Sequence, residues 1–210
     1  MGRLLAVAAT AALVAGCQVT STSTPSPLPS PTNHASVSAA VLQSSDVPAE
    51  LKPCPSSGSL DSYITSLQSS DPNLAQSLAS QWQALKKAGA TEGAIALFAA
   101  DQTACTAELA ARGTVKSAAS LILAFGDEGE ADRAWQAGIL GFAPPAPGEL
   151  PPGMARGPGT GLGTAAWTYD HSPVLLACWR RTVLVALLLT NNLENAIFKA
   201  AAAAVDARIH

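Results

Sequence analysis

Charged residues, and basic ones above all, are scarce in this sequence. The 210 residues include 12 Lys and Arg and 15 Asp and Glu, and only Lys86-Lys87 and Arg180-Arg181 place two basic residues side by side. Proteins that bind nucleic acids rely on clustered Lys and Arg to neutralise phosphates. The composition therefore argues against nucleic acid as a partner, and its length and its 48% of hydrophobic residues predict one compact domain with its own core.

The sequence also lacks an uninterrupted apolar run of the roughly 20 residues that a membrane-spanning helix needs. The apolar run at 4–14 follows Arg3 and ends before Gly16, and Arg180-Arg181 interrupts the apolar stretch 174–189. A short basic start, an apolar run and small residues are the three parts of an export signal. Residues 1–16 are therefore predicted to be a signal peptide.

Val14-Ala15-Gly16-Cys17 resembles the lipobox of bacterial lipoproteins. In that family a diacylglyceryl group is joined to the cysteine and the signal is cut just before it. The resemblance implies that Cys17 is the lipid-bearing N-terminus, which anchors the protein to the cell membrane on its extracytoplasmic side. Two or three acyl chains give durable anchoring, since each buried CH₂ contributes about 0.8 kcal/mol. A plain secretory signal with a chance cysteine is the alternative.

Residues 17–38 are rich in Ser, Thr and Pro and have little to bury. Such a composition favours an extended, semi-rigid chain. We therefore expect a lipid-anchored linker at 17–38 and a single extracytoplasmic domain at 39–210.

Cysteine is scarce as well, which limits both disulfides and metal sites. With Cys17 assigned to lipid, Cys54, Cys105 and Cys178 remain, and export permits a disulfide. A Cys54–Cys105 bridge is favoured because it would tie down the Pro-flanked segment around Cys54, although connectivity is not readable from sequence. The cysteines lie far apart along the chain, so neither a metal site nor a cofactor is predicted.

The pattern of apolar and turn residues predicts an α+β fold. Two N-terminal helices are expected, one at 60–68 and one that begins at Pro72 after the N-cap Asp71 and ends at Gly89. Six strands are expected at 93–99, 104–110, 117–125, 165–169, 174–179 and 182–189. Asp127 is expected to cap a helix after the third strand, and Asn191 a helix after the sixth.

These elements form two strand-strand-strand-helix halves, preceded by the N-terminal helices. We expect a mainly antiparallel sheet with both late helices on one face. In general layout the domain, at about 45–209, resembles small exported lipoprotein and sensor-type domains of high-GC bacteria. That resemblance implies an envelope location and the fold class, and no activity.

A long loop dense in Pro and Gly is expected at 142–163. Loops longer than about 12–15 residues without secondary structure are usually functional or mobile. The nearby apolar run 183–189 must be covered on both faces or line a pocket. A ligand or partner surface is therefore placed at Trp167, Trp179, Phe142 and Leu162. Core packing is the alternative for the tryptophans, and a nucleotide site is disfavoured because the glycines precede a strand and not a helix.

No catalytic constellation stands out. The nucleophile-elbow motif Gly-x-Ser-x-Gly is absent. His171 beside Asp170 indicates a turn, and the acidic residues of 127–132 are explained by helix capping and a solvated first turn. We therefore expect a lipid-anchored binding or interaction module without catalytic residues, which recognises a hydrophobic small molecule or an envelope protein. The alternatives are a sensor or accessory lipoprotein that presents the 142–163 loop to a partner, and an envelope hydrolase.

Replacing Cys17 by Ala should release the protein from the membrane, because the acyl chains would have no attachment site. The measurement is the distribution of the full chain between membrane and soluble fractions of its host. Cys178→Ala is the matched control and should leave the protein with the membrane. A Cys17→Ala protein that stays in the membrane fraction and keeps its signal would contradict the lipoprotein interpretation.

Overall fold

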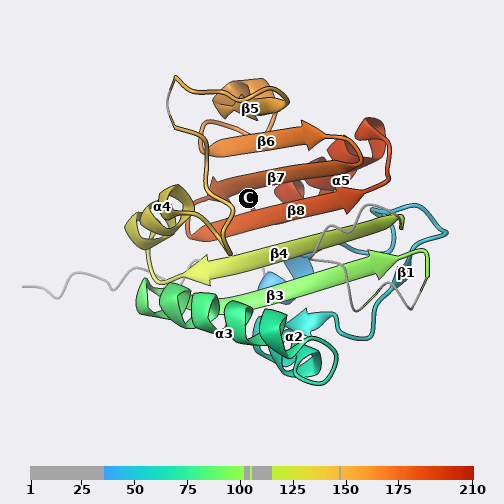
Figure 1. The fold of residues 1–210 in the computed structure, drawn as a ribbon. Coiled ribbons are helices and arrows are strands. Elements are labelled where there is room, and N and C mark those ends of the chain that lie inside the picture. Colours follow the sequence, from blue (N-terminus) through green and yellow to red (C-terminus); the bar gives the residue numbers. More distant parts are fainter. Residues whose placement is uncertain (1–35, 102–104, 106–114, 147) are drawn as a thin grey trace, which may run out of the picture. The chain divides into compact units, whose positions relative to one another are not determined.

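The computed structural model describes residues 36–101, 105, 115–146 and 148–210 (Figure 1). In these residues one antiparallel sheet has the strand order β1-β3-β4-β8-β7-β6-β5, with β2 also paired to β3. The fold is therefore α+β with a mainly antiparallel sheet, as predicted. The lipobox lies outside the described residues, and so does the strand expected at 104–110 apart from Cys105.

The elements agree closely with those expected from the sequence over most of the described chain. The strands are β1 Lys52–Pro53, β2 Gly58–Ser59, β3 Ala90–Ala99, β4 Ser117–Phe125, β5 Met154–Arg156, β6 Ala166–His171, β7 Val174–Arg181 and β8 Leu184–Asn191. The helices are α1 Val37–Ala40, α2 Leu60–Leu67, α3 Pro72–Lys87, α4 Glu128–Ala137 and α5 Asn195–Arg208, with a short 3₁₀ helix, η3, at Gly157–Thr160.

The antiparallel pair β4 and β8 forms the centre of the sheet, as expected for the strand at 117–125. Leu121 pairs with Leu187 in the middle of the two strands, and nearly every residue along both is buried. Because successive side chains point to opposite faces of a strand, this burial requires cover on both sides of the sheet. The face packed against α2, α3 and α4 is called the front face, and the face packed against α1 and α5 the back face (Figure 1).

The prediction that both late helices share one face is wrong. Ala134 and Trp135 of α4 join the front core, whereas Phe198 and Val205 of α5 join the back core. If both helices packed on the front, the back of β4 and β8 would be left to α1, which has only 4 residues. Dividing the helices between the faces removes more apolar surface from water.

The predicted start of the last helix is also wrong. Asn191 is the final residue of β8, where it pairs with Ser117 of β4 and Val174 of β7. Its side-chain Nδ2 donates to the Val115 carbonyl at 3.0 Å. Asn191 therefore belongs to the sheet, and α5 begins only at Asn195. The buried residues of α5 are Phe198, Ala201, Ala202 and Val205.

The segment 142–163, expected to be a loop without secondary structure, contains β5 and η3. β5 extends the sheet by pairing with β6, from Met154 opposite Tyr169 to Arg156 opposite Trp167. Gly153 permits this pairing because its φ of 81° is open to glycine and because a Cβ there would clash with the Asp170 carbonyl. The sequence pattern missed the strand because three residues are too few to show a period.

Capping residues fix the helices of the front face as predicted. Asp71 Oδ1 accepts from the Leu74 amide at the start of α3, and Asp127 Oδ1 accepts from the Glu130 amide at the start of α4. Gly89 follows α3 with a φ of 106°, and a Cβ there would clash with the Glu130 carboxylate. The start of α4 thus packs closely against the end of α3.

On the back face, Arg208 at the end of α5 holds the first described residues of the chain. Its Nη2 lies 2.5 Å from Asp46 Oδ2 and donates to the Val41 carbonyl at 3.1 Å. Because Val41 follows α1 directly, these bonds fasten the beginning of the fold to its last helix. This set of contacts is called the Arg208 clasp.

The structure joins Cys54 to Cys105 in a disulfide, the pairing favoured from the sequence. The two cysteines are 51 residues apart, so the bridge closes a loop that contains β2, α2, α3 and β3. A cross-link of that length restricts the unfolded chain strongly.

Replacing Cys54 by Ser should lower the free energy of unfolding by about 2–4 kcal/mol, because the unfolded chain would gain conformational freedom. Urea denaturation under oxidising conditions measures the change. Reductant added to the wild-type protein should reproduce the loss and should leave the Cys54→Ser variant unaffected. An unfolding midpoint that reductant does not shift in the wild type would contradict a stabilising bridge.

Candidate functional site

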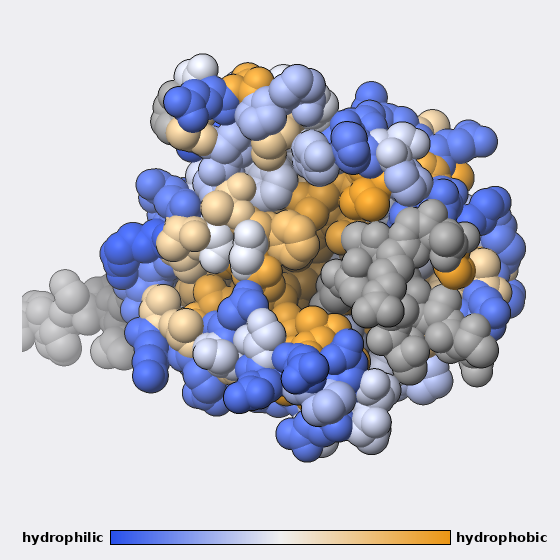
Figure 2. Space-filling model, in the orientation of Figure 1, coloured by the Kyte–Doolittle hydropathy of each residue, from blue (hydrophilic) through white to orange (hydrophobic). Residues whose placement is uncertain are grey.

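The helices of the front face leave part of it open. A hollow of about 600 Å³, called the helix hollow, lies between α3 and α4. Its walls include Gln81, Ala84 and Leu85 of α3 and Ala134 and Ala137 of α4. The small alanine side chains keep the two helices from filling the space. Figure 2 shows apolar residues gathered in a recess on this side of the molecule, with hydrophilic residues around it.

A second hollow of about 320 Å³, called the sheet hollow, lies against β6, β7 and β8. Its lining is apolar and aromatic and includes Phe142, Met154, Trp167, Tyr169, Leu176 and Leu189. Gly141 lines both hollows, which are therefore neighbours on the front face. The two together are called the front groove.

Strand alternation places Trp167 and Tyr169 of β6 in the sheet hollow. Trp167, Tyr169 and His171 are two residues apart, so they lie on the same face of the strand. The rings of Tyr169 and His171 are stacked, with their centroids 5.6 Å apart. Trp167 is only 3% exposed and belongs to the front core.

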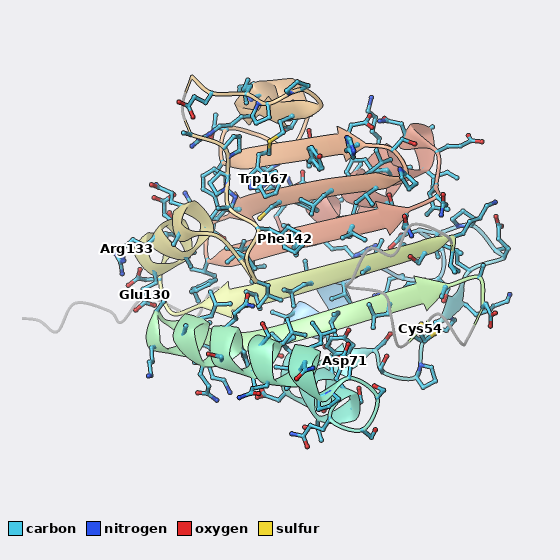
Figure 3. The ribbon with its side chains drawn as sticks, viewed as in Figure 1. Cys54, Asp71, Glu130, Arg133, Phe142 and Trp167 are labelled. Carbon is cyan, nitrogen blue, oxygen red and sulfur yellow. A yellow bond between two sulfur atoms is a disulfide. The ribbon has the colours of Figure 1, made fainter. Side chains whose placement is uncertain are left out.

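A tight turn after α4 brings Phe142 over the sheet. Ile139 and Phe142 exchange two backbone hydrogen bonds of 3.0 and 2.9 Å, and the turn between them has positive φ at Leu140 and Gly141. Ile139 is buried, which holds the turn against the front core. Figure 3 shows Phe142 and Trp167 together on the front side of the sheet.

Charge is confined to the rim of the groove. Arg133 of α4 is exposed and, among the described residues that line the two hollows, is the one that is charged at neutral pH. Nearby, the half-buried Arg156 guanidinium lies 5.7 Å from the centre of the Trp135 ring, and its Nη1 donates to the Pro145 carbonyl. The interior of the groove therefore favours an apolar occupant over an ionic one.

The structure separates the four residues that the sequence suggested for a ligand or partner surface. Phe142 and Trp167 meet in the sheet hollow on the front face. Trp179 is fully buried in the back core, and Leu162 is also buried there. Trp179 and Leu162 thus pack in the back core, which is the alternative that the sequence left open for the tryptophan.

Sequence reasoning missed Gln81, Met154 and Tyr169 as lining residues. Tyr169 carried a usable signal, because it stands two positions after Trp167 in a predicted strand. Met154 carried none, since β5 itself was not recognised. Gln81 lies next to Trp82 on a predicted helix, and only the placement of α4 shows that it borders a hollow.

The acidic and histidine residues considered for catalysis have other contacts. Asp170 Oδ2 accepts from Asn195 Nδ2 at 2.8 Å beside α5, while the His171 ring stacks on Tyr169. Asp132 Oδ1 lies 3.3 Å from Arg180 Nε in an ion pair. In the described part of the chain, no three His, Cys, Asp or Glu side chains come close enough to hold a metal ion.

Cys178 of β7 is a free thiol within the front core. Burial raises the pKa of this thiol well above its usual range, and the indole N–H of Trp135 opposes the rise only in part. The reactive thiolate is therefore suppressed and the sulfur is shielded by the surrounding core.

The Cys178 thiol should react with a disulfide reagent such as DTNB only when the domain opens. In the native protein at mildly alkaline pH, we expect labelling far slower than in urea-unfolded protein, where the pKa returns to its ordinary value. A time course of absorbance under both conditions measures this. Native labelling at the rate of the unfolded chain would contradict the burial of Cys178.

No protein-family model, curated protein or solved structure matches this chain. What the front groove can hold is therefore inferred from the residues that line it.

Proposed function

We propose that this protein is a lipid-anchored, extracytoplasmic binding protein that holds a hydrophobic small molecule in its front groove. The observation that carries the proposal is the pair of neighbouring apolar hollows, of about 600 and about 320 Å³. Small-molecule sites are typically concave, mostly apolar and about 300–1,000 Å³ in volume. The aromatic lining of the sheet hollow adds large, rigid contact surface for such a ligand.

The anchored location is supported by the sequence around Cys17, which lies outside the described residues. The lipobox resemblance and the Ser/Thr/Pro-rich segment that follows fit a domain held at a membrane by lipid. Among the described residues, no helix is long and apolar enough to span a bilayer. An anchored domain would stay near the membrane from which it takes its ligand or to which it delivers it.

Binding is proposed over catalysis because the groove offers apolar contacts and few reactive groups. Among the described residues of its lining, Arg133 is the only one charged at neutral pH and is exposed at the rim, and Tyr169 adds one phenol in the sheet hollow. General acid or base catalysis needs a titratable group within hydrogen-bond reach of the reacting atoms. The lining of the groove thus fits a binding site better than a catalytic site.

Recognition of a partner protein through 142–163 is supported by one observation. Leu150 in this segment is 55% exposed and is the one large hydrophobic residue exposed in the described part of the chain. A single apolar side chain covers little area, whereas partner surfaces are normally extended patches. The groove therefore supports ligand binding more strongly.

Filling the helix hollow should weaken binding of an apolar probe. Ala84 is exposed on α3 and lines the hollow, so Ala84→Phe would place a phenyl ring in the ligand's space. We expect N-phenylnaphthylamine to bind about tenfold more weakly or worse, because overfilling a packed site costs about 1–3 kcal/mol. Fluorescence titration of the full chain carrying Cys17→Ala, which needs no detergent, measures the affinity.

Gln83→Phe is the matched control, because Gln83 is exposed on the same helix and lines neither hollow. It should leave the probe affinity unchanged. Equal effects of the two substitutions, or no binding of the probe to the parent protein, would contradict a site in the front groove. Native mass spectrometry of the protein from its host gives an independent test, which looks for a small molecule lost in Ala84→Phe and kept in Gln83→Phe.

A further inference from the structure

Arg133 differs from the other arginines in the described part of the chain, because its guanidinium has no carboxylate or carbonyl partner there. The other four each bond to such a group: Arg156 to Pro145, Arg180 to Asp132, Arg181 to Asp206 and Arg208 to Asp46. A guanidinium carries five N–H donors in a planar fork and stays charged at physiological pH. An unpaired arginine at a surface is ordinary in itself, since water solvates it. What distinguishes Arg133 is that it also lines the helix hollow.

The helix hollow has two ends, and Arg133 lies at one of them. The hollow runs along α3 from Gln81, which lies near Gly141, to Ala88, beyond which the start of α4 packs. An α-helix rises about 1.5 Å per residue, so this stretch of α3 spans roughly 10 Å. Arg133 belongs to the Ala88 end, because it leans back toward the first turn of α4, where a Cβ on Gly129 would lie 3.3 Å from its Nη1. Gly141, at the other end, also lines the sheet hollow.

Two acidic side chains lie near this guanidinium, and neither forms an ion pair with it. Asp127 Oδ1 accepts from the Glu130 amide as the cap of α4. The Glu130 carboxylate packs against Gly89 and Gly126, where an added Cβ would lie 2.2 and 2.9 Å from its Oε2. This end of the hollow therefore offers one unpaired positive charge with two negative charges close by.

We propose that the ligand of the front groove is a long-chain carboxylate. Its head group pairs with Arg133 at the rim, and its chain runs through the helix hollow and past Gly141 into the sheet hollow. Figure 3 shows Arg133 well to the side of Phe142 and Trp167, which is the separation of head and tail that an extended amphiphile needs. This proposal rests on the proposed function and specifies the chemistry of its ligand.

A carboxylate suits Arg133 better than other common head groups do. The guanidinium fork can donate two parallel hydrogen bonds to the two carboxylate oxygens. A phosphate monoester carries nearly two negative charges at neutral pH, and Asp127 and Glu130 would repel the second. An ammonium head would meet Arg133 as a like charge. A head group at the exposed rim also stays hydrated, so the ligand buries its chain and avoids the cost of burying a charge.

The test uses four probes that share one alkyl chain and differ in the head group. Dodecanoate, dodecyl phosphate, dodecanol and dodecylamine each compete with N-phenylnaphthylamine for the full chain carrying Cys17→Ala, at concentrations below micelle formation. We expect dodecanoate to bind about two- to fivefold tighter than dodecylamine, the range for an exposed ion pair, and tighter than dodecyl phosphate. The protein has a net charge of −3, which by itself would favour the amine. A preference for the carboxylate must therefore come from a local positive group.

Substitutions of Arg133 assign the preference to one residue. Arg133→Gln should abolish the preference for dodecanoate over dodecylamine, and Arg133→Glu should reverse it. Lys87→Gln is the matched control, because Lys87 is exposed on the neighbouring helix α3 and lines neither hollow. It removes the same charge from the protein, and the preference should survive it. Urea denaturation should give the same midpoint for Arg133→Gln as for the parent protein, so that a lost preference is not lost structure.

The outcomes separate this proposal from the proposed function. Equal binding of dodecanoate and dodecylamine to the parent protein would overturn the carboxylate and leave the apolar site standing. A preference that persists in Arg133→Gln, or tighter binding of dodecyl phosphate, would overturn it as well. If no dodecyl probe displaces bound N-phenylnaphthylamine, only the present proposal fails. If N-phenylnaphthylamine itself does not bind, both proposals fail.

Discussion

The structure depends above all on one pair of strands, β4 and β8, whose side chains are buried on both faces of the sheet. Their central residues, such as Leu121 and Leu187, are opposite each other and fully enclosed. A strand pair of this kind is unstable until each face has its own cover, because apolar area left in water forfeits about 25 cal/mol per Å². Helices α2, α3 and α4 cover the front and α1 and α5 the back. The front groove lies where α3 and α4 do not meet.

Much of the fold follows from local sequence patterns. The continuous apolar runs of β4 and β8 mark two-sided burial, and Asp71 and Asp127 mark helix starts that the structure keeps. Local patterns fail where the neighbouring strands of the sheet decide whether a residue belongs to a strand or to a helix. Asn191 has the chemistry of a helix cap, but it pairs with both neighbouring strands and so belongs to β8. Which face of the sheet α4 and α5 pack against depends on how all the helices together cover both faces. The sequence of one segment does not contain that information.

The candidate site was harder to foresee than the fold. Trp167 and Trp179 look alike in sequence, each being an aromatic residue in an apolar strand. Trp167 lines the sheet hollow on the front face, whereas Trp179 is fully buried in the back core. Gln81 became visible as a site residue only once α4 was placed across from α3. The alternation of side chains along a strand shows which residues share a face of the sheet. It does not show which face the helices leave uncovered.

The Arg208 clasp has a mechanical consequence for the first described residues of the domain. A force applied at Ser36 would enter the fold at α1, whose end is bonded to Arg208 of α5. That force would pass to the last helix through the ion pair with Asp46 and through hydrogen bonds from Arg208 to the Ala40 and Val41 carbonyls. All of these contacts lie on the back of the sheet. A force applied at Ser36 would therefore act behind the sheet and spare α3 and α4, so the front groove would keep its shape.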